Sequence, residues 1–147
     1  MIILHGNNNE VLDVRLSNIL KHLENSDKIF WKLLWVDGVS YHIRELPFSQ
    51  GKHMLDFEKY INNSPSGIRI STKELLQLSD VMHDLIEITI IGDENEQSLI
   101  KLENDDEIKS HCTYFIELID SSYWEIMSKD ESFLKSIKRD FNYKEID

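Results

Sequence analysis

The fold class is decided by residues 112–127, in which two apolar runs are joined by three polar residues. The sequence reads Cys112-Thr-Tyr-Phe-Ile-Glu-Leu-Ile119, then Asp120-Ser121-Ser122, then Tyr123-Trp-Glu-Ile-Met127. A connection of three residues brings two strands back alongside each other, so this stretch predicts an antiparallel hairpin.

Strands are also predicted before this hairpin. In residues 29–36 both the odd and the even positions are apolar, except at Lys32. Because these positions face opposite sides of a sheet, the pattern predicts an inner strand covered on both faces. The dipeptide Asp37-Gly38 is preferred in two-residue hairpin turns, so a returning strand is expected over residues 39–44.

Three more stretches have strand character. Residues 85–91 are rich in β-branched side chains and predict a strand. Residues 67–70 are expected to form a short strand, and residues 98–102 are expected to pair back on the strand at 85–91.

Helices are predicted from apolar stripes at helical spacing and from capping residues. The first should cover about residues 10–25, and a short helix is expected within residues 45–66. Ser71 and Glu74 match a capping box before a helix over about 72–83. A second box, Ser128-Lys-Asp-Glu131, is expected to open a closing helix, whose apolar stripe is Phe133, Leu134, Ile137 and Phe141.

This order of elements predicts an α+β fold with a mostly antiparallel sheet, packed against about three to four helices on one face. The chain has 147 residues, which is the size of one globular domain, and the domain is expected to span residues 1–147.

Charge and composition exclude several classes of protein. Lys and Arg number 16 against 27 for Asp and Glu, a net charge of −11, which disfavours a nucleic-acid partner. The start of the chain lacks the basic region of a signal peptide, and no apolar stretch is long enough to predict a membrane span. A single cysteine, Cys112, fits a reducing compartment, so a cytoplasmic location is expected.

The negative charge is concentrated in one segment. Between Asp84 and Glu107 there are nine acids and one base, Lys101, which together supply eight of the eleven net negative charges. Such a run is commonly a solvated face, but it can also steer a basic partner. The residues expected to bind that partner are Asp93, Glu94, Glu96, Glu103, Asp105, Asp106 and Glu107.

No motif predicts a catalytic, metal or cofactor site. His111 and Cys112 are neighbours on an expected strand, where adjacent side chains point to opposite faces, so Cys112 is interpreted as a buried structural thiol. The six histidines lack the spacing of metal ligands. Residues 93–104 fail as a calcium loop because Ser98 replaces the required glycine and Asn104 the required glutamate.

Residues 112–141, which contain the hairpin and the closing helix, resemble small bacterial immunity proteins of polymorphic and contact-dependent growth inhibition toxin systems. The resemblance implies a small, acidic, cytoplasmic protein that blocks a toxin domain, often a basic nuclease, by covering its active site or substrate surface. It assigns no binding residue.

Function is therefore expected to be non-enzymatic inhibition of a cognate toxin, with acids of residues 93–107 taking the place of nucleic-acid phosphate in a basic cleft. Two alternatives stay open: a small hydrolase that uses Cys112 or dispersed carboxylates, and a ligand-binding regulatory domain. A toxin gene immediately upstream would favour the inhibitor.

Overall fold

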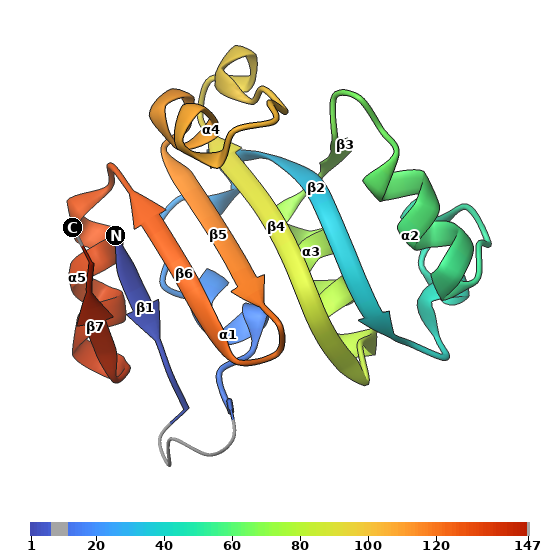
Figure 1. Ribbon diagram of the computed structural model, residues 1–147, viewed down its shortest axis with the longest axis horizontal. Helices are drawn as coiled ribbons and strands as arrows, with labels where there is room; N and C mark the ends of the chain where they lie inside the picture. Colours follow the sequence, from blue (N-terminus) through green and yellow to red (C-terminus); the bar gives the residue numbers. More distant parts are fainter. Residues whose placement is uncertain (7–11, 147) are drawn as a thin grey trace.

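The computed structural model describes residues 1–6 and 12–146, which form an α+β fold built on one antiparallel sheet (Figure 1). In these residues the sheet has seven strands in the order β3-β2-β4-β5-β6-β1-β7. The strands are β1 (Ile2–Leu4), β2 (Phe30–Val39), β3 (Ile68–Ile70), β4 (Asp84–Asp93), β5 (Tyr114–Ile119), β6 (Tyr123–Ser128) and β7 (Tyr143–Glu145). The predicted fold class is confirmed.

Five α-helices accompany the sheet in the described residues, one or two more than the sequence predicts. They are α1 (Leu16–Leu20), α2 (Met54–Asn62), α3 (Thr72–Val81), α4 (Asp105–His111) and α5 (Glu131–Asp140). Over residues 1–6 and 12–146, no helix combines the length and apolarity that crossing a membrane requires.

Several predicted elements are confirmed. The hairpin is β5 and β6, with Ile116 opposite Ile126 and the turn at Asp120 and Ser121, both at positive φ. β2 is an inner strand between β3 and β4, but the expectation that both its faces are covered is wrong, since Phe30 and Trp35 are exposed. The Ser71 side chain accepts from the backbone N–H of Glu74 at 3.1 Å, as the capping box at the start of α3 requires.

The two faces of the sheet are covered differently. Side chains such as Leu33, Ile90 and Ile116 point to the main core, to which α1, α2, α3 and α5 contribute. Their neighbours along the strands, Ile91 and Phe115, point the other way into a smaller cluster under α4. The expectation that all helices lie on one face is therefore wrong for α4. Below α4 in Figure 1 the central strands are in full view.

The predicted turn at Asp37-Gly38 is wrong, and so is the returning strand over 39–44. β2 continues through Val39, with Gly38 opposite Leu85 of β4. The glycine is needed for close approach, since a Cβ at this position would lie 2.4 Å from the backbone oxygen of Asp84.

The first helix is much shorter than the predicted range of 10–25. Residues 10 and 11 lie outside the described residues, and α1 begins only at Leu16. The carbonyl of Val14 accepts the indole N–H of Trp124 at 2.8 Å. This contact holds the chain before α1 against the core in a non-helical conformation.

Two predictions near the ends of strands are also corrected. The N-cap of α5 is Asp130, whose side chain accepts from the N–H of Phe133 at 3.1 Å, because Ser128 is still paired in β6.

Residues 98–102 do not pair with β4. Instead Leu99 is buried in the cluster under α4, so this segment covers the sheet.

Candidate functional site

The last part of the predicted acidic segment, residues 103–107, leads into and begins α4, which covers one end of the open sheet face (Figure 1). Ile108 of α4 packs into the cluster with Phe115, which holds the helix on the sheet. The Asn104 side chain accepts from the N–H of Asp106 at 2.8 Å and caps the helix. The three acids of the first helical turn are stabilised by the helix dipole, which partly offsets their mutual repulsion.

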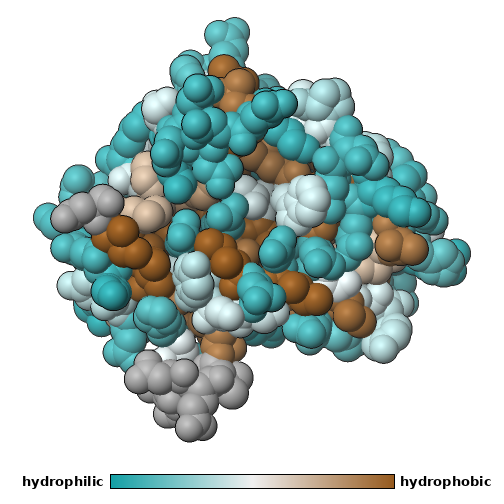
Figure 2. Space-filling model, viewed as in Figure 1, coloured by the Kyte–Doolittle hydropathy of each residue, from teal (hydrophilic) through white to brown (hydrophobic). Residues whose placement is uncertain are grey.

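Two of the seven predicted partner-binding acids have structural roles. One carboxylate oxygen of Asp93 accepts from the N–H and the hydroxyl of Thr113, at 2.9 and 2.8 Å. Glu96 pairs with Arg69 at 2.7 Å. The other five are exposed: Glu94, Glu103, Asp105, Asp106 and Glu107. We refer to Glu103, Asp105, Asp106 and Glu107 as the acidic rim. Figure 2 shows hydrophilic surface over α4 and mixed surface on the sheet.

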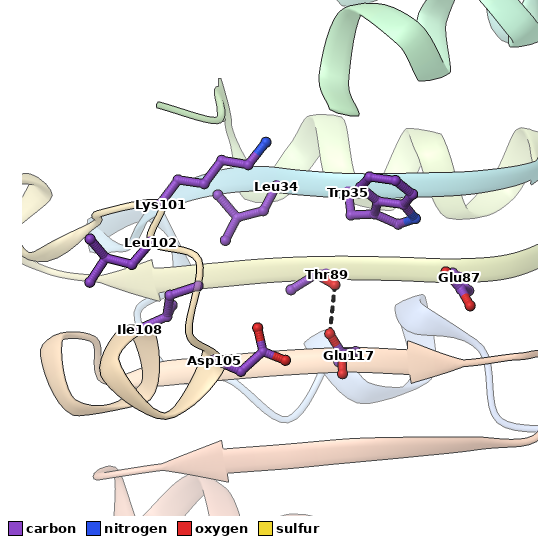
Figure 3. Close-up of a pocket in the computed structure, with 9 residues that line it drawn as sticks. All are labelled: Leu34, Trp35, Glu87, Thr89, Lys101, Leu102, Asp105, Ile108 and Glu117. Atoms are coloured by element: carbon purple, nitrogen blue, oxygen red, sulfur yellow. Dashed lines mark hydrogen bonds between the residues drawn. The ribbon is translucent and has the colours of Figure 1, made fainter. Parts of the chain in front are cut away.

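A pocket of about 280 Å³ opens between α4, the segment before it and the sheet (Figure 3). Its lining combines an aromatic ring, aliphatic side chains, three carboxyl groups, a hydroxyl and a lysine. These residues are Leu34, Trp35, Glu87, Thr89, Lys101, Leu102, Asp105, Ile108 and Glu117. Asp105 belongs to the acidic rim, so the rim and the pocket form one continuous site.

A β-bulge places two consecutive residues of β2 in this pocket. The pairing with β4 shifts between Leu33 and Trp35, so Leu34 and Trp35 both line the pocket while Leu33 and Val36 point to the main core. Leu34 is buried and Trp35 is 43% exposed. The bulge therefore presents an accessible indole ring on the open face.

The carboxyl groups of the pocket face little positive charge. Burial, supported by the negative charges of Asp105 and Glu125, raises the pKa of Glu117, although the Thr89 hydroxyl donates to it at 2.8 Å. Burial lowers the pKa of Lys101. The Lys101 ammonium group donates to two carbonyls beyond the end of the pocket, at 2.7 and 3.2 Å, and points away from Glu117 in Figure 3.

A second cation near the pocket is engaged elsewhere. Lys109 lowers the pKa of Glu117, but its ammonium group lies 4.8 Å from the ring centre of Phe115 and 4.0 Å from Glu125. The pocket therefore has an excess of negative charge and an apolar wall.

Of the nine residues that line the pocket, only Asp105 is among the predicted partner-binding residues. The other eight include Trp35, Glu87 and Glu117. Glu117 had a recognisable signal, because it is an acid in the middle of the apolar stretch 112–119. No sequence signal marked Trp35, because the β-bulge in β2 determines the sheet face to which its side chain points. No group of three or more His, Cys, Asp or Glu side chains in residues 1–6 and 12–146 is arranged to hold a metal ion.

Cys112 is fully buried, and burial raises the pKa of its thiol to about 11. His111 beside it is exposed, at the end of α4.

We expect Cys112 to react slowly with iodoacetamide at neutral pH in the folded protein, because the thiolate is the reactive species. Cys112→Ser should leave function intact. Rapid alkylation accompanied by loss of function would contradict this.

In comparisons with known proteins, no family model, curated protein or solved structure matches this chain.

Proposed function

We propose that the protein is a non-enzymatic immunity protein that binds and neutralises a basic toxin domain in the cytoplasm. The observation that carries the proposal is the acidic rim, which lies beside a negatively charged pocket on an open sheet face. The resemblance of residues 112–141 to immunity proteins points the same way.

Charge explains how such a surface would act. Clustered carboxylates attract a basic surface over a distance of about one Debye length and raise the rate of encounter. The apolar side chains of the pocket and of the sheet then slow dissociation. A toxin whose active site binds phosphate would be blocked by carboxylates that occupy the same basic groove.

The α4 packing supports a role for the rim in binding. The acids are concentrated on a short helix that is fixed to the sheet through Ile108 and capped by Asn104. A rigid arrangement loses little conformational entropy on binding. In contrast, Asp93 already accepts hydrogen bonds from Thr113 and Glu96 is already paired with Arg69, so neither is expected to contribute directly to association.

A four-charge variant tests this proposal. The variant Glu103→Gln, Asp105→Asn, Asp106→Asn and Glu107→Gln keeps side-chain size and removes the charge of the rim. Its association with the purified product of the adjacent upstream reading frame should slow by on the order of tenfold at low ionic strength. The rate should also lose most of its salt dependence, as measured by stopped-flow fluorescence.

The matched control removes four exposed acids from the covered side of the sheet and the segments around it: Glu24, Asp56, Asp80 and Glu131. It has the same net charge as the rim variant, and two of its acids also lie in the first turns of helices. If the two variants have equal association rates and equal salt dependence, the acidic rim is not part of the interface.

A small hydrolase is the second candidate, and one observation favours it. Glu117, whose pKa burial raises, shares a pocket with a second carboxyl group, Asp105, and a carboxyl group with a raised pKa can act as a general acid. If the pocket is catalytic, Glu117→Gln should reduce turnover by about 10²–10⁴. An inhibitor would show no turnover to lose.

A further inference from the structure

We propose that the pocket between α4 and the sheet receives one arginine side chain of the partner, with its guanidinium group stacked on Trp35 and paired with the surrounding carboxylates. This inference rests on the proposed function and specifies the chemistry by which the partner is anchored.

The size of the pocket favours a single side chain. Pockets for drug-sized ligands span about 300–1,000 Å³, and this one, at about 280 Å³, lies just below that range. It is open at the surface beside the acidic rim, through Asp105. A side chain that projects from a docked protein can therefore enter without any rearrangement of the fold.

The charge of the pocket favours a cation. Glu87, Asp105 and Glu117 line it, and the one lysine among its lining residues, Lys101, is bonded to the carbonyls of Asn62 and Ser64. Three carboxyl groups thus lack a cation of their own in the cavity. Binding a cation would relieve the repulsion among them.

The apolar part of the pocket distinguishes arginine from lysine. A guanidinium group is planar, is weakly hydrated, stacks on an indole ring and pairs with carboxylates through two hydrogen bonds at once. Trp35 offers an accessible ring. Leu34, Leu102 and Ile108 offer aliphatic surface for the methylene stem. A lysine ammonium group would gain the charge interaction but lose the stacking.

The environment of Glu117 is also consistent with an arginine ligand. Burial and neighbouring acids raise its pKa in the free protein, so its charged form is held at a cost. A guanidinium group beside it would stabilise the carboxylate and lower that pKa. The titration of Glu117 therefore reports directly on occupancy.

Nuclear magnetic resonance tests this inference without the partner. The probe is N-acetyl-arginine methylamide, added to protein labelled with ¹⁵N. The indole N–H signal of Trp35 should shift saturably. The signals of Trp31 and Trp124 should stay in place, because those indoles are buried and bonded to the Thr72 hydroxyl and the Val14 carbonyl.

Three further small molecules test the specificity of the pocket for an arginine side chain. The neutral analogue N-acetyl-citrulline methylamide should give no saturable shift, and the blocked lysine should bind at least several-fold more weakly. Free arginine should bind no more tightly than the blocked form, because its α-ammonium and α-carboxylate groups add no net charge and the pocket is proposed to hold only the side chain. Equal binding of citrulline, or tighter binding of free arginine, would overturn the inference, the latter by indicating a site for a small metabolite.

Variants separate the pocket from the rim. Trp35→Ala and Glu117→Gln should each weaken the binding of blocked arginine by tenfold or more. Because Trp35→Ala lacks the reporting indole, binding to all variants is followed through the backbone N–H signals of Thr89 and Glu117, which line the pocket. Glu103→Gln, which removes a rim charge outside the pocket lining, should change it by less than twofold. The absence of any saturable shift in the wild type, or unchanged binding in both pocket variants, contradicts the inference.

Different results would contradict the arginine pocket and the proposed toxin partner. If only the pocket is wrong, Trp35→Ala will associate with the upstream gene product as the wild type does, while the rim variant will associate slowly. If the proposed function is wrong, blocked arginine will still bind in the pocket, but no complex with that product will form.

Discussion

Truncation after Met127 should leave a chain that is insoluble or unfolded. It removes α5, whose Phe133 and Ile137 are fully buried in the main core. Each such side chain contributes about 1.5–3 kcal/mol when buried, against a total stability of about 5–15 kcal/mol for a typical domain. Thermal unfolding followed by circular dichroism checks the result.

A shorter truncation provides the matched control. Removal of residues after Asn142 deletes β7, whose three residues are all exposed, and leaves α5 complete. This chain should unfold cooperatively, with a transition close to that of the full protein. If the truncation after Met127 also gives a soluble chain with a cooperative transition, α5 is not needed for the fold.

Gly92→Ala is expected to be the most damaging of the single substitutions considered. The backbone of β4 passes directly beneath the ring of the buried Trp31, and a Cβ on Gly92 would lie 2.4 Å from that ring. Overpacking of this kind costs about 1–3 kcal/mol or more. For a domain of this size, the melting temperature should fall by roughly 2–4 °C for each kcal/mol lost.

Two comparisons isolate the clash as the cause. Gly51 has positive φ and open space around it, so Gly51→Ala tests backbone strain alone, which should cost about 1 kcal/mol. In a Trp31→Phe background the ring is smaller, and Gly92→Ala should cost less than in the wild type. An equal cost in both backgrounds would mean that contact with Trp31 is not responsible.

The elements that could be predicted from sequence are those formed by neighbouring residues. The β5–β6 hairpin depends on a three-residue turn, and the start of α3 depends on Ser71 and Glu74. Both are local arrangements, in which the residues that determine the structure are close together in the chain.

The elements that were missed depend on distant parts of the chain. β1 pairs with β6 and β7, so residues 2–4 become a strand only when the C-terminal segment is in place. Each of these terminal strands has three residues, too few for an alternating pattern to be recognised. Gly38 was misinterpreted for the same reason, since its role is set by its contact with β4.

The candidate site could be predicted only in part. An acidic segment is visible in sequence, and five of the seven predicted acids are indeed exposed. Sequence could not show that Asp93 is held by Thr113, 20 residues away. Nor could it show that a bulge places Trp35 on the same sheet face as Glu117, because this depends on how β2, β4 and β5 pair.

Growth protection is the most direct test of the proposal that this protein neutralises a toxin. The measurement is the survival of bacteria that express the upstream gene product together with the wild type, the rim variant or the control variant at equal protein levels. We predict full protection by the wild type and the control variant, and greatly reduced protection by the rim variant. Failure of the wild type to protect, or equal protection by both variants, would contradict the account.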